Sequence, residues 1–107
     1  MTVRHAYVDG NNNTYEIGDR LEYVPITPER SSSGIYSGGP PKSVVLATEQ
    51  RAQLIALLER IAADTENLLA DRPKGSGTVI HGDQRAVCRG SSPLKQELET
   101  MLRALLV

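Results

Sequence analysis

Residues 48–70 read TEQRAQLIALLERIAADTENLLA, and this stretch decides the fold class. Its apolar positions recur at intervals of four, three, four and three residues, which is the spacing of one face of an α-helix. Thr48 offers an N-cap oxygen, and Arg72 is pushed out of the helical region because Pro73 follows it. We therefore predict a helix from Thr48 to about Ala70 with one buried face. That face consists of Leu54, Leu58, Ile61, Thr65 and Leu68, widened by Ile55, Leu57, Ala62 and Leu69.

A second amphipathic helix is predicted at the C-terminal end of the chain. Ser92 is a suitable N-cap, and Pro93 suits the first helical position because its missing N–H is not needed there. Glu99 and Arg103 lie four residues apart, in the order that favours an ion pair on a helix surface. The predicted apolar face is Leu94, Leu98, Met101, Leu102 and Leu105, and the polar face is Lys95, Gln96, Glu99 and Arg103.

Strands are predicted on both sides of the first helix. An antiparallel meander precedes it, and Pro25 should weaken the third strand or place it at an edge, because proline donates no hydrogen bond. A hairpin follows the helix, since Gly82 and Asp83 form a typical two-residue connection. The predicted strands are residues 3–8, 14–17, 20–26, a short buried strand at 43–46, and the hairpin strands 78–81 and 84–88.

Two apolar helix faces and an antiparallel sheet bury each other most simply in two layers. We therefore predict an α+β fold with two layers: a mostly antiparallel sheet of about five or six strands, with both helices on one face and the order βββ(β)-α-ββ-α. At 107 residues the chain is expected to form a single domain over 1–107. If the open face of the sheet carries Tyr and Val side chains, a homodimer or a protein partner would be the natural cover.

The aromatic residues of the chain are four tyrosines, with no Phe and no Trp. A buried tyrosine hydroxyl needs a hydrogen-bond partner, so we expect these rings at the boundary of the core or in a groove. They are Tyr7, Tyr15, Tyr23 and Tyr36.

Charge and composition exclude several classes of function. The formal net charge is −1, so no overall positive field exists to collect nucleic acid or anionic lipid. No apolar stretch approaches the roughly 20 residues needed to span a bilayer, and the first residues lack the apolar core of a signal peptide. Cys88 is the single cysteine. We expect a cytoplasmic protein with no nucleic-acid or membrane partner.

Residues 27–42, TPERSSSGIYSGGPPK, are too rich in Ser, Gly and Pro for a regular element. Loops of this length in a compact domain are usually functional or disordered. A second Gly-rich loop spans residues 72–77, and exposed backbone N–H groups in such loops can bind anions. The two loops could also lie at opposite ends of the first helix and never meet. The candidate binding residues are Arg30, Ser31, Ser32, Ser33, Tyr36, Ser37, Lys42, Arg72 and Lys74.

Catalytic and metal-binding patterns are incomplete. His5, His81, Asp83 and Cys88 do not have the spacing of a zinc site, so no metal and no cofactor is expected. No Gly-x-Ser-x-Gly elbow follows a strand, and Cys88, in an apolar segment, is expected to be an inert buried thiol. The carboxylates of the meander are interpreted as a solvated sheet face: Asp9, Glu16, Asp19 and Glu22.

Three hypotheses about function remain open. The first is a non-catalytic binding module, such as an inhibitor, an immunity-type protein or a regulator, that acts through the 27–42 loop. The second is a binder of a small anionic ligand or nucleotide that uses the Gly/Ser/Lys loops 31–42 and 72–77. The third, and weakest, is a small hydrolase that uses His81 and a loop serine.

Overall fold

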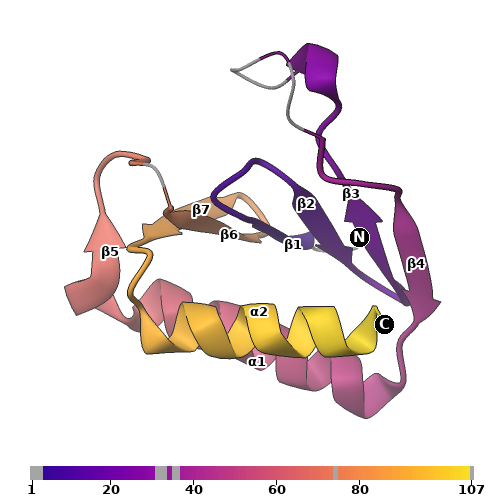
Figure 1. Ribbon diagram of the computed structural model, residues 1–107. Helices are drawn as coiled ribbons and strands as arrows, with labels where there is room; N and C mark the ends of the chain where they lie inside the picture. The colour runs from indigo at the N-terminus through magenta and orange to yellow at the C-terminus, as the bar shows by residue number, and fades with distance from the viewer. Residues whose placement is uncertain (1–3, 31–33, 35–36, 74, 107) are drawn as a thin grey trace.

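A computed structural model describes residues 4–30, 34, 37–73 and 75–106. These residues form one antiparallel sheet of seven strands in the order β4-β3-β2-β1-β6-β7-β5, together with two α-helices (Figure 1). The α+β class is confirmed, with one or two strands more than predicted. The strands are β1 (His5–Val8), β2 (Thr14–Ile17), β3 (Arg20–Val24), β4 (Lys42–Val45), β5 (Leu68–Leu69), β6 (Gly77–His81) and β7 (Gln84–Cys88). The helices are α1 (Thr48–Ala63), α2 (Pro93–Leu105) and the short 3-10 helices η1 (Pro28–Arg30) and η2 (Thr65–Asn67).

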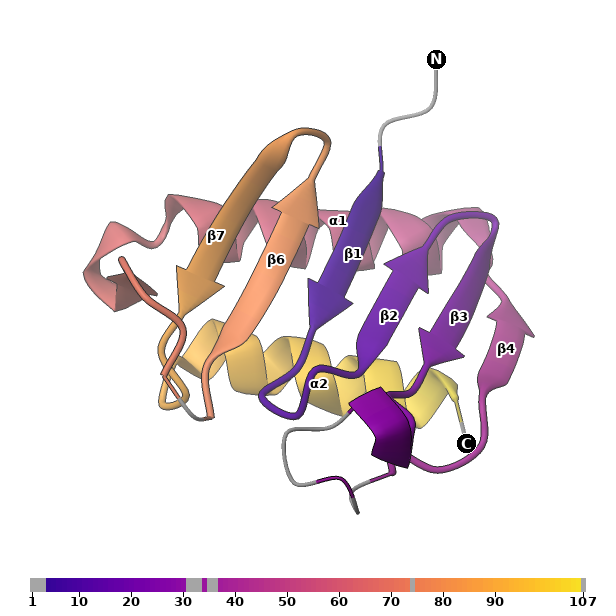
Figure 2. The same cartoon turned by 90° about the horizontal axis from the view of Figure 1, so that it is seen from above.

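Both α-helices cover the same face of the sheet, as predicted (Figures 1 and 2). Leu54 and Leu58 of α1 and Leu98 and Leu102 of α2 have an exposed fraction of 0%. They pack with Leu57, Ile61 and the inward side chains of the strands in one core. Burial of these leucines removes the apolar surface of two helices and one sheet face from water, which is the main force that stabilises the fold.

The prediction that α1 continues to Ala70 is wrong, because the helix ends at Ala63. Asp64 and Asn67 instead close a turn, in which the Asn67 backbone N–H donates to the Asp64 carbonyl and the side-chain amide donates to the Asp64 carboxylate at 2.7 Å. Leu68 and Leu69 then pair with β7 as the edge strand β5. The helical spacing of Leu68 in the sequence therefore reflects the need for burial, which a strand at the sheet edge satisfies equally well.

Strand β4 is an edge strand, and the prediction of a buried strand at 43–46 is wrong. Of its four residues only Val44 is partly buried, and Val45 is 64% exposed. The apolar run Val44–Leu46 misled the prediction, since only Val44 and Leu46 reach the core side. Strand β3 is not at an edge, but it ends at Val24, immediately before Pro25, which agrees with the predicted weakening.

The ends of α1 and β1 differ in detail from the prediction. Thr48 is the first helical residue rather than the N-cap, and the Gln50 side chain accepts a hydrogen bond from the Ala47 N–H at 2.9 Å. Strand β1 begins at His5, and Val3 lies outside the described residues.

The hairpin and the second helix agree closely with the prediction. Gly82 connects β6 to β7 with a φ of 62°, a conformation that glycine adopts without strain. The Ser92 side chain accepts a hydrogen bond from the Lys95 N–H, which makes it the N-cap of α2. Cys88 has an exposed fraction of 0%, as expected of an inert thiol, and burial raises its pKa.

Helix α2 is fastened to the centre of the sheet by a polar contact that the sequence analysis missed. The Tyr7 hydroxyl of β1 donates to Glu99 Oε2 at 2.6 Å, and Lys95 Nζ lies 3.1 Å from the same oxygen. Lys95 and Glu99 were predicted on the exposed face of α2, yet Lys95 is buried and Glu99 is largely covered. The prediction of a Glu99–Arg103 ion pair is replaced by this three-residue cluster, because Glu99 satisfies a buried hydroxyl and a buried ammonium group together.

The open face of the sheet carries polar side chains next to the apolar ones. The three described tyrosines, Tyr7, Tyr15 and Tyr23, all point to the helix side. They therefore do not form an apolar surface on the open face that a dimer would bury. Glu16 and Glu22 are neighbours on the open face. No helix among the described residues has the length and apolarity that crossing a bilayer requires.

Replacement of Glu99 by alanine should destabilise the fold by about 2 to 4 kcal/mol, because it leaves the Tyr7 hydroxyl and the Lys95 ammonium buried without their acceptor. Urea unfolding followed by circular dichroism measures the difference. The matched control is Glu97→Ala, an exposed glutamate on the same helix, which should change the unfolding free energy by less than about 0.5 kcal/mol. Equal effects of the two substitutions would contradict the role assigned to the cluster.

Candidate functional site

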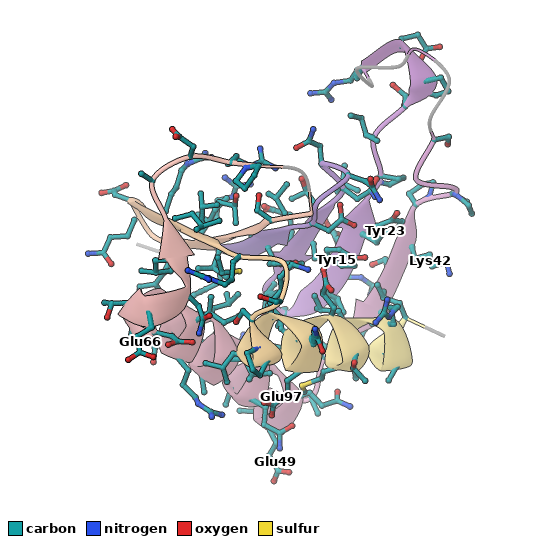
Figure 3. The ribbon with its side chains drawn as sticks, turned by 60° about the vertical axis from the view of Figure 1, so that its left-hand side comes forward. Tyr15, Tyr23, Lys42, Glu49, Glu66 and Glu97 are labelled. Carbon is teal, nitrogen blue, oxygen red and sulfur yellow. The ribbon has the colours of Figure 1, made fainter. Side chains whose placement is uncertain are left out.

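Three tyrosines and a lysine form a row across four neighbouring strands. In the register of the strands, Tyr15 of β2 lies opposite both Tyr7 of β1 and Tyr23 of β3. Tyr23 in turn lies opposite Lys42 of β4. The ring centroids of Tyr7 and Tyr15 are 6.0 Å apart, and those of Tyr15 and Tyr23 are 5.0 Å apart. Figure 3 shows Tyr15, Tyr23 and Lys42 following one another toward the sheet edge. The row begins in the core, at Tyr7, and reaches solvent at Lys42.

The outer part of this row lines a groove of about 350 Å³ between the sheet and the C-terminal end of α2. Two strands supply the tyrosines, and the loop that precedes β4 supplies one wall. Helix α2 and the residue after it supply the other wall. The lining residues are Tyr15, Tyr23, Gly38, Pro40, Lys42, Arg103 and Leu106.

Among the described residues, two cations and no side-chain carboxylate line the groove. Lys42 and Arg103 both line it, and neither forms an ion pair with another residue of the described chain. Arg103 is available because Glu99, its expected partner, turns inward to Tyr7 and Lys95. A protein of net charge −1 thus has a locally positive groove.

Tyr15 provides a neutral hydroxyl in the groove. Burial raises its pKa to about 12, the carboxylate of Asp9 adds to this effect, and the positive charge of Arg103 opposes it. The hydroxyl is therefore protonated at physiological pH and can donate a hydrogen bond to an anionic group.

The loop between β3 and β4 is closed at its base by a set of hydrogen bonds. The Gly38 N–H donates to the Ile26 carbonyl at 3.1 Å, and the Tyr23 hydroxyl donates to the Gly38 carbonyl at 2.6 Å. The Ile26 N–H donates to Asn13 Oδ1 at 2.9 Å, and Asn13 is only 2% exposed. Asn13 is held in turn by Asp9, whose two carboxylate oxygens accept from its backbone and side-chain N–H groups. The groove wall is therefore preformed.

The tip of the same loop stands away from the groove. Helix η1 projects from the sheet on the side opposite the α-helices (Figures 1 and 2), and it places the exposed Arg30 there. Ser37 Oγ accepts a hydrogen bond from the Gly39 N–H at 3.2 Å, near the base. The structure therefore separates Arg30 from Lys42. Four predicted site residues lie outside the described residues: Ser31, Ser32, Ser33 and Tyr36.

The second Gly-rich loop lies at the same end of the sheet, on the other side of the β1–β2 turn. Arg72 Nη2 donates to Asn12 Oδ1 at 2.7 Å, and Gly10 lies against Gly75. Asn13, in the same turn, contacts Gly38 of the first loop. The β1–β2 turn thus separates Arg72 from the groove. Lys74 lies outside the described residues.

The histidines lie at the opposite end of the strands. His5 and His81 are cross-strand neighbours with ring centroids 4.7 Å apart, whereas the loop bases adjoin the Val8 end of β1. Ser37 is therefore remote from His81. Over the described ranges, no group of three or more His, Cys, Asp or Glu side chains has the arrangement of a metal site.

Three of the four carboxylates of the meander have structural partners, and the fourth, Glu22, is exposed. Glu16 Oε1 lies 2.7 Å from an Arg4 guanidinium nitrogen, and Asp19 Oδ1 lies 2.6 Å from Arg51. Asp9 caps the β1–β2 turn. The interpretation as a sheet face therefore holds for Glu16 and Glu22, which face each other on β2 and β3, whereas Asp9 and Asp19 lie in the turns between strands.

Of the groove residues, only Lys42 was among the candidate binding residues. Tyr15 and Tyr23 lie in a groove, as expected of the tyrosine rings, whereas Arg103 and Leu106 were not anticipated as site residues. The pairing of Tyr15 with Tyr23 requires a hairpin centred on Asp19, in which Ile17 faces Leu21. A two-residue Gly18–Asp19 connection between the predicted strands would have placed Tyr15 opposite Glu22 instead. Nothing in the sequence indicated that Arg103 would meet these rings, because that contact depends on how α2 lies across the sheet.

No protein-family model matches the sequence, and neither a curated protein nor a solved structure matches it significantly.

Gly38→Ala should disrupt the base of the β3–β4 loop, because a Cβ at Gly38 overlaps the Asn13 side chain and lies 2.7 Å from Pro25 Cβ. We expect a loss of about 1 to 3 kcal/mol in unfolding free energy, and shifts in the NMR signals of Ile26 and Tyr23. Gly18→Ala is the control, since its nearest neighbour would be 3.9 Å away. A Gly38→Ala protein with unchanged stability and unchanged Asn13 signals would contradict the described anchor.

Alkaline titration should show that Tyr7 and Tyr15 ionise later than ordinary tyrosines, whose pKa is about 10. Burial raises the pKa of both groups, that of Tyr15 to about 12. Because the folded-state pKa of Tyr15 is raised, the stability that this group contributes is complete below about pH 10 and is lost as the pH rises through about 12. Tyrosinate absorbance measures the steps, and Tyr15→Phe should remove the one near 12. Ionisation of all four tyrosines near pH 10 in a protein that is still folded would contradict the assignment.

Proposed function

We propose that this protein is a non-catalytic binding module that holds an acidic part of a protein partner in the groove of Tyr15, Tyr23, Lys42 and Arg103. The observation that carries the proposal is the pair of cations on a preformed aromatic surface with no carboxylate of the described chain beside them. A partner carboxylate would gain charge-assisted hydrogen bonds there.

The composition of the groove is typical of a protein interface. Tyrosine and arginine are enriched among residues that contribute most to binding, since they combine a large contact area with hydrogen-bonding groups. The hydrogen bond that Tyr23 donates to Gly38 and the one that Asn13 accepts from the Ile26 N–H hold the wall in place before any partner binds. A preformed site loses less conformational entropy on binding, so more of the contact energy appears as affinity.

Within this class, the protein acts as an inhibitor, an immunity-type protein or a regulator, and the expected compartment is the cytoplasm. The projecting tip with Arg30 would add contacts to a partner large enough to reach around the loop.

A small anionic ligand, such as a nucleotide, is the second candidate. The same groove offers ring surfaces for a base and two cations for phosphate, and its volume of about 350 Å³ suits a small molecule. A thermal-shift screen with nucleotides separates the candidates, since a ligand at a hundredfold its dissociation constant should stabilise the protein by about 2.7 kcal/mol.

Charge reversal at Lys42 and Arg103 tests the proposed function. The double substitution Lys42→Glu and Arg103→Glu should abolish co-purification of a protein partner from the source cells, because it replaces attraction by repulsion at the centre of the site. Arg60→Glu is the control, since Arg60 is exposed on α1 outside the groove. Both proteins should unfold at nearly the same temperature. Equal capture of the partner by both would contradict the proposal.

A further inference from the structure

The outer edge of β4 has backbone groups available for another strand. The Leu46 N–H donates to the Asp19 carbonyl at 3.0 Å, so these two residues are a hydrogen-bonded pair in the register of β3 and β4. Hydrogen-bonded and non-hydrogen-bonded pairs alternate along an antiparallel pair of strands. Val44 and Lys42 therefore direct their backbone groups to β3, while Ser43 and Val45 direct theirs outward. No backbone hydrogen bond to another described residue occupies the outward groups of Ser43 and Val45.

The side chains of β4 alternate across the same edge. Lys42 and Val44 point to the helix side, where Lys42 ends the tyrosine row and lines the groove. Ser43 and Val45 point to the open face, and Val45 is one of the two large hydrophobic side chains in the described chain that are mainly exposed. An added strand would therefore meet a cation on one side and an apolar surface on the other.

We propose that the partner supplies an extended segment that pairs antiparallel with β4 as an additional strand, with an acidic side chain opposite Lys42 and within reach of Arg103. This inference rests on the proposed function and names the class of partner. Two residues of the segment would exchange hydrogen bonds with Ser43 and Val45. The acidic residue would lie opposite Lys42 at a position that is not hydrogen-bonded, where cross-strand side chains are closest.

A second copy of this chain does not fit the same edge. Strand β4 reads Lys-Ser-Val-Val and contains no acid. In an antiparallel pair of two β4 strands, side chains on the helix side meet one another, so Lys42 would face Lys42, Val44 or Leu46 of the other copy, depending on the register. Such a dimer leaves the charges of Lys42 and Arg103 without a counter-ion, whereas an acidic segment supplies it.

The residues before β4 limit the pairing to a short segment. Pro40 and Pro41 have no N–H to donate, and lysine at an edge is a common guard against nonspecific strand addition. An acidic residue opposite Lys42 would neutralise the lysine charge, so Lys42 would favour a strand that carries a carboxylate at that position. The combination excludes apolar strands and admits one with a carboxylate at the matching position.

The test uses a capped peptide of alternating valine and threonine that contains one glutamate. In the proposed antiparallel pairing, the peptide residue immediately before the glutamate faces Ser43, and the glutamate itself faces Lys42. NMR titration to millimolar peptide should protect the Ser43 and Val45 amides from hydrogen exchange and shift the signals of Lys42 and Arg103. Methylation of the backbone nitrogen of the residue before the glutamate should weaken binding by about tenfold or more, because that N–H points to Ser43. Methylation at the glutamate nitrogen is the matched control and should change affinity by less than about threefold, because that N–H points away.

The outcomes separate this inference from the proposed function. Binding that is lost with Lys42→Glu but responds equally to both methylations, with no protection at Ser43 and Val45, overturns strand pairing and leaves the groove as a binding site. Failure of the glutamate peptide to bind, or equal binding of a peptide with lysine in place of glutamate, also overturns the inference. A β4-mediated dimer of the protein, detected by sedimentation and by the same amide protection without peptide, overturns it as well.

Discussion

The hydrogen bond from the Tyr7 hydroxyl to Glu99, shared with the Lys95 ammonium, is the contact on which the rest of the structure depends. It joins the central strand β1 to the middle of α2, and an unpaired hydroxyl and ammonium in the same place would be costly. The leucines of both helices supply most of the stabilisation, but apolar contacts are not directional. The polar cluster therefore selects one placement of α2 on the sheet among several that would bury the same leucines.

That placement also creates the groove. Because Glu99 turns inward, Arg103 one helical turn later forms no ion pair with a carboxylate of the described residues, and it lines the groove with Tyr15 and Tyr23. The row of cross-strand neighbours extends from Tyr7 on β1 through Tyr15 and Tyr23 to Lys42 on the edge strand β4. A structural contact in the core thus determines the charge of the groove, and the hydrogen bonds at the loop base hold the groove wall in place.

Prediction from the sequence succeeded where local chemistry and tertiary packing agree. Helix α2 has its N-cap, proline and apolar face as read from the residues, and the Gly82–Asp83 hairpin follows its turn chemistry. Prediction failed at Leu68 and Leu69, where helical spacing continued into a segment that the edge of β7 captures as β5. It failed again at β4, where three consecutive apolar residues suggested a buried strand although neighbouring strand residues point to opposite faces. Of the selected binding residues that the structure describes, only Lys42 lines the groove.

The sequence by itself determined the α+β class, the two amphipathic helices, the turns and the burial of Cys88, because each depends on periodicity or on residues close along the chain. Only the tertiary structure decided that Lys95 and Glu99 face inward, that Tyr15, Tyr23, Lys42 and Arg103 line one groove, and that Asn13 holds the base of a loop that begins after β3. Each of these contacts joins residues distant in sequence. Their formation depends on how α2 crosses the sheet and on the order of the strands, and no local pattern of side chains specifies either one.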